Sequence, residues 1–555
     1  MTAYTGFLYS QIGYNHDQPK RLIVRGPVNT LPDHANFTIS QNGDELYSGP
    51  ITHWGETWGS HWWIGDFSEL TTCGTFSASI HDGDSVPFTC DDLHIGDDIL
   101  WQESFDLVAL DQLERRNGFS INDNGVKEGW LDAGMPWQEA NSHAATLLGL
   151  CDIIDHQADR LSESQRERLE KQIRTGADYL VHLQNKASKL GKKAGACVHQ
   201  SFVLYQGKVP PLNELVLPGD VSKLSGALAR VANVINDEKT ELYRERATLA
   251  MDWILNDADY TALPFLPGPH RLPDDVKAPQ DIPTSDLVMI LLCAIESGDE
   301  RAPELAKQWL ARQIKADNAQ DGIYGHFYLW DDERVIERNW WHGVAGEGMG
   351  YNNGQTLGHH LMVLIRLIKA LPEHPDNADW CDALKHYCYG YFIPACQSNP
   401  FYLMPNVHYA DEGFLGFAGL WHGINAIYGN AAALAMALYE FYPEEELIQI
   451  ATGNLQWIAG LNSGVTKDSL EACMVYSIDI DDDIALPASQ IHGIGNRSCG
   501  CWLNLKGAIT NGFCTGQQFA WDVEQTRDND GPFTLTDEDW ITHSGGWFSG
   551  LSFYS

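Results

Sequence analysis

Basic residues are scarce in this chain of 555 residues, where 36 Lys and Arg stand against 75 Asp and Glu and the net charge is −39. Because binding to phosphate backbones depends on clustered Lys and Arg side chains, this balance argues against a nucleic-acid partner. Long apolar runs are also missing, since no stretch reaches the roughly 18 residues that a membrane span needs. We therefore expect neither nucleic acid nor a membrane as a partner.

Targeting signals and nucleotide-binding motifs are missing as well. The N-terminal segment has neither a basic region nor an apolar core, so it is not a secretory signal, and we expect a cytoplasmic protein. Without such a signal, the 12 scattered cysteines are better explained as free thiols than as a disulfide framework. The chain contains no G-x-G-x-x-G, no P-loop and no G-x-S-x-G.

We expect no cofactor, although two metal sites stay open as alternatives. The segment Asp481-Asp482-Asp483 clusters oxygen ligands that could bind Ca²⁺, but a solvated acidic loop explains it more simply. Cys499 and Cys501, with Cys473 and Cys514 nearby, could hold a metal, but their spacing is not that of a standard zinc site.

Two hydrophobic periods divide the chain. Residues 1–98 contain short β-branched and aromatic runs, one of which, 75–80, alternates with period two. Turn signals separate these runs, which predicts a small β-sandwich. Its tryptophans at 54, 58, 62 and 63 are expected to pack between domains rather than to contact a ligand.

Residues 99–555 follow a helical period, with apolar residues at i, i+3 and i+4. Ser162 and Ser285 are the expected N-caps of two of the helices. Helices in six consecutive hairpins predict an (α/α)6 barrel, and its long connections are expected to gather on one face and form a cleft. The expected helical segments are 103–116, 138–155, 163–185, 219–236, 238–256, 286–297, 299–316, 352–371, 376–393, 423–441, 445–460 and 543–555.

Several short motifs then occur in a fixed order. The one that organises the rest is Gly129 to Gly134, which places Asp132 in a glycine turn just before a helix, where a carboxylate is well placed to face a ligand. The others are Gln11 to Tyr14, Arg115 to Gly118, Trp421 to Asn425, Ile458 to Asn462, Arg497-Ser498 and Glu538 to Leu551. Together they make the chain resemble glycoside hydrolase family 9, the cellulase-type inverting hydrolases with an N-terminal immunoglobulin-like domain.

The resemblance implies a pair of catalytic carboxylates. Glu538 matches the general acid of the family, and it lies between Asp537 and Asp539, whose like charges favour a protonated acid. Asp132 matches the first aspartate of the family's D-A-G-D loop, which helps to hold the attacking water. The second aspartate, the usual base, is replaced by Met135. Asp132 could then be the sole base, or Glu139 near the start of the helix could substitute.

Plainer interpretations remain open for each acid. Glu538 could belong to a solvated acidic turn, Asp132 could cap a helix, and Glu139 could interact only with a helix dipole.

The resemblance also implies residues that hold the sugar. His492 and Arg497 match family groups at the cleavage subsite, and Arg is suited to bridging hydroxyls and carboxylates. Trp137, Trp341 and Trp421 could stack on sugar rings, with core packing as the equal alternative. His422 and His543 neighbour these motifs and complete the candidate set.

The sequence thus predicts a glycoside hydrolase acting on a β-linked oligosaccharide by acid/base catalysis, most simply with inversion. Because Met135 and His543 depart from the family pattern, two alternatives stay open. The same fold could process a different sugar or linkage, transfer included, or it could bind sugar without turnover. An epimerase or lyase that uses His342 and Tyr351 is a further possibility.

Overall fold

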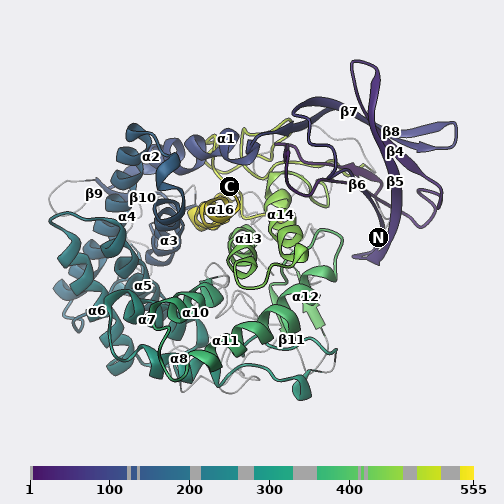
Figure 1. Cartoon of the computed structure of the whole chain (residues 1–555). Coiled ribbons are helices and arrows are strands. Elements are labelled where there is room, and N and C mark those ends of the chain that lie inside the picture. The colour runs from purple at the N-terminus through teal and green to yellow at the C-terminus, as the bar shows by residue number, and fades with distance from the viewer. Residues whose placement is uncertain are drawn as a thin grey trace.

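The computed structural model shows a β domain beside a helical barrel (Figure 1). It describes residues 4–121, 127–133, 138–200, 214–260, 281–319, 321–328, 359–409, 414–417, 423–466, 484–513 and 538–555. Among these residues, no helix has both the length and the apolar character needed to cross a membrane. The predicted fold class, a β domain followed by an (α/α)6 barrel, is confirmed.

The N-terminal part folds into an eight-stranded sheet with the strand order β1-β3-β6-β5-β4-β7-β8-β2. The long strand β5 joins two groups of strands, because residues 44–50 pair with β4 and residues 51–57 pair with β6. The strands are β1 (Gly6–Leu8), β2 (Tyr14–Asn15), β3 (Arg21–Gly26), β4 (Asn36–Gln41), β5 (Asp44–Thr57), β6 (Ser60–Asp66), β7 (Gly74–Asp82) and β8 (Ser85–Gly96). The first helix begins at Ile99, and the domain division after residue 98 remains a prediction.

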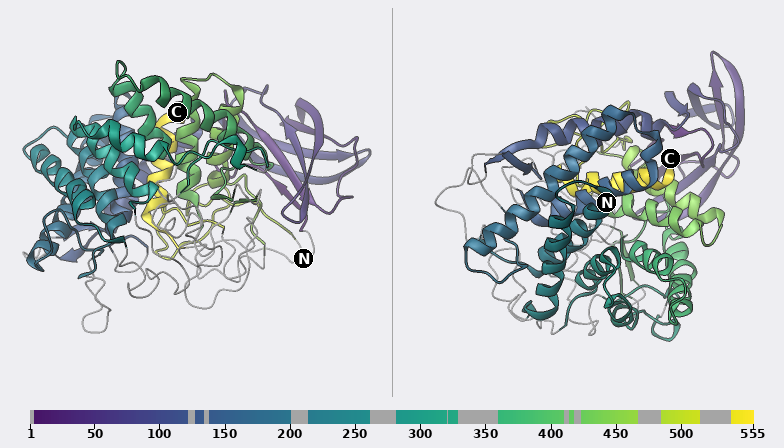
Figure 2. Two further views of the ribbon diagram at one scale, coloured as in Figure 1. Left: turned by 90° about the horizontal axis from the view of Figure 1, so that it is seen from below. Right: turned by 60° about the vertical axis from the view of Figure 1, so that its left-hand side comes forward.

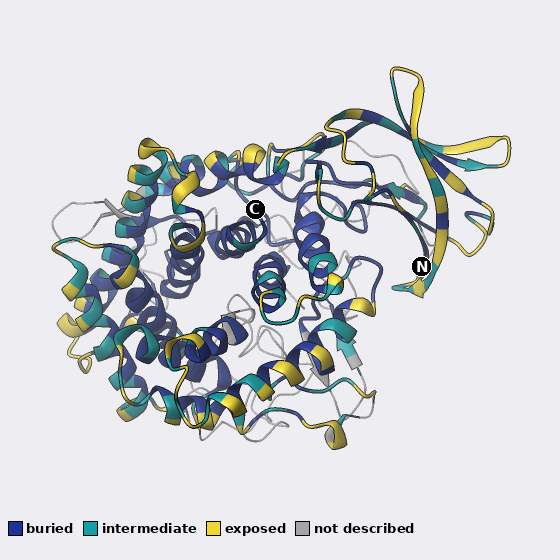
Figure 3. Ribbon diagram, in the orientation of Figure 1, coloured by how far each residue is buried: buried dark blue, intermediate teal, exposed yellow. Residues whose placement is uncertain are grey.

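The helical part contains a closed ring of inner helices, in which α3, α5, α7, α10, α13 and α16 each contact the next and α16 contacts α3 (Figure 2). Their bounds are α3 (Ala140–Gln157), α5 (Pro218–Val234), α7 (Thr284–Ser297), α10 (His359–Ala370), α13 (Asn425–Tyr439) and α16 (Ile541–Tyr554). Each is apolar or small-sided around most of its circumference, which is the pattern of a helix buried on all sides. Figure 3 shows them dark blue inside an outer layer with exposed faces.

The outer helices lie against this ring. They are the run of α1 (Ile99–Phe105), η1 (Asp106–Asp111) and α2 (Gln112–Arg116), then α4 (Glu163–Lys189), α6 (Thr240–Asn256), α8 (Ala302–Leu310), the run of α11 (Asn377–His386), η7 (Tyr387–Phe392) and α12 (Ile393–Gln397), and α14 (Glu445–Ala459). Each helical segment predicted from the sequence therefore corresponds to a helix, or to a run of consecutive helices, in the structure. Two short hairpins, β9 (Asn117–Ile121) with β10 (Lys127–Trp130) and β11 (Val407–Tyr409) with β12 (Phe414–Gly416), complete the described elements.

One predicted helix cap is confirmed and the other is wrong. The Ser162 hydroxyl accepts a hydrogen bond from the Gln165 N–H, and the Gln165 side-chain oxygen accepts one from the Ser162 N–H, which makes a capping box. Ser285 lies inside the first turn of α7 instead. Pro283, whose ring fixes φ, holds the extended N-cap position two residues earlier.

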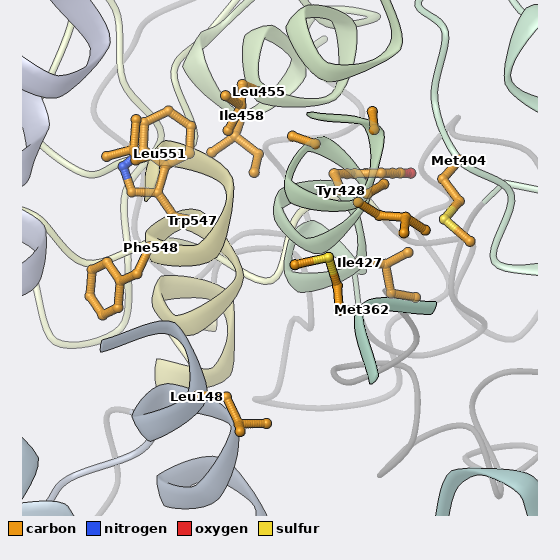
Figure 4. Close-up of a cluster of buried hydrophobic side chains, with 14 of the residues drawn as sticks. Leu148, Met362, Met404, Ile427, Tyr428, Leu455, Ile458, Trp547, Phe548 and Leu551 are labelled. Atoms are coloured by element: carbon orange, nitrogen blue, oxygen red, sulfur yellow. The ribbon is translucent and has the colours of Figure 1, made fainter. Parts of the chain in front are cut away.

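Glycines let α16 pack very closely between α3 and α13. A Cβ on Gly149 of α3 would lie 2.1 Å from the carbonyl oxygen of Gly545, and one on Gly429 of α13 would lie 2.2 Å from that of Gly546. Above these contacts, Trp547 and Leu551 of α16 belong to the core cluster that also contains Leu148 of α3 (Figure 4). The backbone of α16 is therefore fixed against both neighbours, and so is the segment that leads into it.

The β domain is joined to the barrel by aromatic packing and hydrogen bonds. The ring of Trp58 stacks on Phe401 with 6.2 Å between centroids, and the buried Trp62 meets the same ring edge-on at 5.2 Å. Arg25 donates to the Ser463 carbonyl at 2.8 Å. For Trp58 and Trp62, the prediction of packing between domains is confirmed.

The predicted clustering of long connections on one face stays a prediction. Each of the five connections, 186–218, 257–285, 317–351, 394–422 and 461–542, includes residues outside the described part of the chain.

Candidate active site

The turn that carries Asp132 is fixed by its own motif. Gly129 has φ +69°, and a Cβ there would lie 2.7 Å from the His143 ring and 2.8 Å from Tyr179, so this position requires glycine. Trp130 is fully buried, and its indole donates to Gln172 at 2.9 Å. The motif therefore anchors the turn in the core through Trp130, two residues before Asp132.

Asp132 is completely buried at the N-terminal end of α3. Its Oδ2 accepts hydrogen bonds from the Glu139 backbone N–H at 2.9 Å and from the Ser142 hydroxyl at 3.2 Å. Its Oδ1 is buried and accepts no hydrogen bond from the residues that the structure describes. Asp132 thus helps to satisfy the helix start, as the capping alternative expected, and keeps one oxygen for another partner.

Arg116, from the helix-end motif that precedes the turn, ties the two acidic segments together. Its Nη1 donates to the carbonyl oxygens of Leu131 at 3.1 Å and Asp132 at 3.0 Å. Its Nη2 donates to both the carbonyl and the carboxylate of Asp539, each at 2.8 Å. The Ile541 N–H adds a bond of 2.8 Å to the Asp132 carbonyl. The residues just before α16 are thereby held against the Asp132 turn.

Glu538 precedes α16 and is 5% exposed. Asn511 holds it twice: its N–H donates to the Glu538 carbonyl at 2.7 Å, and its side-chain amide donates to Oε2 at 2.6 Å. Glu538 is therefore a buried, oriented carboxyl group and not part of a solvated acidic turn.

The charges of these acids act on one another. Burial raises the pKa of Asp132 well above its usual range, and the charges of Glu139 and Glu538 raise it further, against the hydrogen bonds that it accepts. Burial also raises the pKa of Asp539 to about 7, although the Arg116 guanidinium opposes the shift. Asp132 and Glu538, separated by 406 positions in the sequence, thus lie within electrostatic reach of each other.

Glu139 faces a second set of buried charges. Its Oε1 lies 3.6 Å from Nε2 of His199, whose Nδ1 lies 2.7 Å from Oδ2 of Asp220 on α5. Burial alone would lower the pKa of His199, but Asp220 and Glu139 outweigh it and raise that pKa to about 10. The two carboxylates therefore favour the protonated form of this buried imidazole.

The other residues predicted from the sequence are less closely connected to the three acids. His543 is buried in the first turn of α16, where its Nδ1 accepts from the Ala426 N–H at 2.9 Å. His492 is bonded to the Cys499 carbonyl and to Asn504, each at 2.9 Å, and the Arg497 guanidinium stands 6.0 Å from the Tyr9 ring of the β domain. Trp137, Trp341, Trp421 and His422 lie outside the described residues, as does Met135. The sugar-binding roles of all these residues stay predictions.

Three residues that the sequence analysis did not single out hold the acids in place. They are Asn511 at Glu538, and His199 and Asp220 at Glu139. No local pattern marks them, because each works through a partner that is far away along the chain. Asp220 could have been suspected as an acid in the first turn after Pro218, but that position alone indicates only a helix start.

Metal ligands do not gather in the described residues, where no group of three His, Cys, Asp or Glu side chains could hold an ion. The ten cysteines that the structure describes are free. Cys473, Cys514 and the 481–483 acidic segment lie outside the described residues, so both metal alternatives stay untested.

Solved structures share this architecture over nearly the whole chain. A metagenome-derived glycoside hydrolase family 9 endoglucanase matches with a TM-score of 0.64 and 14% identity, over 99% of this chain and 99% of that one. The family 9 endoglucanase J30 matches with a TM-score of 0.61 and 14% identity, over 98% and 99%. AaCel9A in complex with cellobiose-like isofagomine matches with 0.57 and 13%, over 99% of both chains.

At the level of sequence, no protein-family model and no curated protein matches the chain. The structural likeness nevertheless shows that the chain has the fold of the family 9 glycoside hydrolases, as its ordered motifs predicted.

Proposed function

We propose that this protein is a glycoside hydrolase that cleaves a β-linked oligosaccharide, with Glu538 as the general acid. The observation that carries the proposal is the buried cluster in which Asp132 and Glu538 are held together by Arg116, Asn511 and the start of α16. Further support comes from solved structures that share the fold, among them a family 9 endoglucanase and AaCel9A in complex with cellobiose-like isofagomine.

In this mechanism Glu538 donates a proton to the glycosidic oxygen as the bond to the anomeric carbon breaks. A water molecule attacks that carbon from the opposite face, and a carboxylate on the Asp132 side accepts its proton. Oδ1 of Asp132, which accepts no hydrogen bond from the described part of the chain, supplies an acceptor for that water or for a sugar hydroxyl. The expected stereochemical outcome is inversion, because the attacking water is activated in place and no glycosyl-enzyme intermediate forms.

The test is turnover of cellotetraose by wild type and by Glu538→Gln, followed as release of reducing sugar. The substitution removes the acidic proton but keeps the shape and the acceptor oxygen, so kcat should fall by about 10²–10⁴-fold. Asp152→Asn is the matched control, since Asp152 is another buried acid, near the opposite end of α3. Wild-type turnover in the Glu538→Gln variant would refute the role of the acid.

The two alternatives predict different results in the same assays. Both alternatives are worth testing because Met135 replaces the usual base. Retention of anomeric configuration, read by NMR of the first product, would indicate a different sugar chemistry. Binding of cello-oligosaccharides by calorimetry, with no turnover of any β-glycoside in a broad panel, would indicate a sugar-binding protein without catalysis.

A further inference from the structure

The chain lacks the aspartate that serves as base in proteins with this motif, and the geometry around Glu139 shows what can replace it. Glu139 is the N-cap residue of α3, with 8% of its surface exposed. Its N–H bonds to Asp132, and its carbonyl accepts from the Ser142 hydroxyl at 2.9 Å and from His143 Nδ1 at 2.7 Å. Its position beside Asp132 is therefore fixed on both sides of the residue.

The two oxygens of the Glu139 carboxylate are each provided with a partner. Oε1 faces Nε2 of His199, and Oε2 accepts from the Asn141 amide at 3.4 Å. The same Asn141 amide bonds to Oδ1 of Asp220 at 3.2 Å, and Oδ2 of Asp220 holds His199 Nδ1. Asp220 thus contacts both His199 and Asn141.

His199 is placed by backbone as well as by its ring. Residue 200 forms an isolated antiparallel bridge with Glu139, and the Ala140 N–H donates to the His199 carbonyl at 2.8 Å. The imidazole is 1% exposed and the Asp220 side chain is fully buried, so solvent does not screen their charges. Screening between His199 and Glu139 is therefore weaker than it would be at the surface.

Asp132 has the opposite surroundings. Among the described residues, its carboxylate receives hydrogen bonds from an N–H and a hydroxyl but from no cation. Of two adjacent buried acids, the one paired with a cation holds the negative charge and the other keeps the proton, because both cannot ionise without cost. These surroundings favour the negative charge on Glu139 and the proton on Asp132.

We propose that Glu139 is the catalytic base of this protein and that His199 and Asp220 are positioning residues that keep it ionised and aimed. This inference rests on the proposed hydrolase function and assigns a residue to the role of base, which that function leaves open. Glu139 takes one proton from the water, the water oxygen bonds to the anomeric carbon, and the sugar–oxygen bond breaks as Glu538 protonates the leaving oxygen. One water is consumed, and proton exchange with solvent resets both carboxyl groups.

Other charged groups also face this carboxylate and bear on its titration. Asp132 faces it from the preceding turn, and Asp220 and Lys223 face it from α5. Asp286 of α7 faces Lys223 in turn. Any pH effect of His199 must therefore be measured against variants that leave these groups in place.

The experiment compares two substrates, cellotetraose and 2,4-dinitrophenyl β-cellobioside, on Glu139→Gln and Glu538→Gln. A dinitrophenolate leaves without a proton, so loss of the acid should slow the oligosaccharide far more than the aryl glycoside. Loss of the base should lower kcat on both substrates alike, by about 10²–10⁴-fold. Wild-type turnover by Glu139→Gln, with Glu538→Gln inactive on cellotetraose, would overturn this inference alone. Wild-type turnover by both variants would overturn the proposed function as well.

The positioning role is tested through the acidic limb of the kcat/KM–pH profile, which reports the base in the free enzyme. Removing the cation in His199→Gln should move that limb to higher pH by about one unit or more, with KM little changed. His199→Asn, which also removes the cation and leaves Asp220 and Lys223 in place, should move the limb in the same direction, and it decides the question if His199→Gln does not fold. Asp152→Asn should leave the limb in place. An unchanged limb in the folded variants would overturn the role of His199.

Discussion

The two ends of the inner ring use buried charge in opposite ways. Near the C-terminal ends of the inner helices, Arg230 of α5 lies 2.6–3.5 Å from Asp152, Asp155 and Glu296, and Arg366 of α10 lies 3.3–3.5 Å from the same three acids. At the N-terminal ends, Asp132 and Glu538 are held by amides, a hydroxyl and backbone groups.

This difference follows the direction of the helices. The inner helices run parallel, so their positive dipole ends converge where the acids gather and their negative ends converge where the arginines lie. Carboxylates at the first end gain support from helix N-termini and can be kept without matching cations. The ring thus has one end in which buried acids are paired with arginines and one in which a surplus of acid is tolerated.

Arg230→Met should have the largest effect on stability. It removes the buried cation that pairs with Asp152, and breaking such a buried network costs about 3–5 kcal/mol. Urea unfolding would measure the loss. If this end is purely structural, kcat on cellotetraose per folded molecule should stay at the wild-type value, and a large drop in kcat would break the proposed division between the two ends.

Arg116→Lys should have a smaller effect on stability but a direct one on activity. A lysine keeps the charge but cannot reach the Asp132 turn and Asp539 together, as the planar guanidinium does. We expect a loss of about 2 kcal/mol in urea unfolding and at least a roughly tenfold fall in kcat, because the spacing of the two acids is no longer fixed. A fall in stability with unchanged kcat would show that Arg116 is structural.

The sequence was sufficient for the architecture because the helical period is strong over long segments. Each of the expected helices has its counterpart, and the order of the motifs led to the Asp132 turn and to Glu538. The wrong N-cap at Ser285 arose where a nearby proline stopped the chain earlier than the serine pattern implied. Such errors concern single residues at helix ends, where local signals compete.

The surroundings of the acids could not be predicted in the same way. Asn511, His199 and Asp220 act across large sequence separations, and their roles exist only once α3, α5 and α16 lie side by side. Glu139 was recognised as a possible base from its place near Asp132 in the sequence. Its pairing with a cation, which separates it from Asp132, required coordinates.

The pH dependence of stability has the smallest expected effect, and it tests whether His199 carries the positive charge that pairs with Glu139. The pKa of His199 is raised from 6.5 to about 10 in the folded state. Its contribution to the free energy of unfolding is therefore fully present below pH 6.5 and is lost as the pH rises through 10. Lys223 acts in the opposite sense, because burial lowers its pKa to about 8 and its contribution grows as the pH rises.

The comparison of wild type with His199→Gln isolates the histidine, since Lys223 is present in both chains. Between pH 7 and 10, Tm of the wild type should fall relative to that of His199→Gln, and the two curves should converge toward pH 10. The curve of Tm against pH for Asp152→Asn should run parallel to that of the wild type, because Asp152 pairs with Arg230 at the other end of the ring. Parallel curves for His199→Gln and wild type would mean that the imidazole is uncharged in the folded protein, and the cation that distinguishes Glu139 from Asp132 would then be absent.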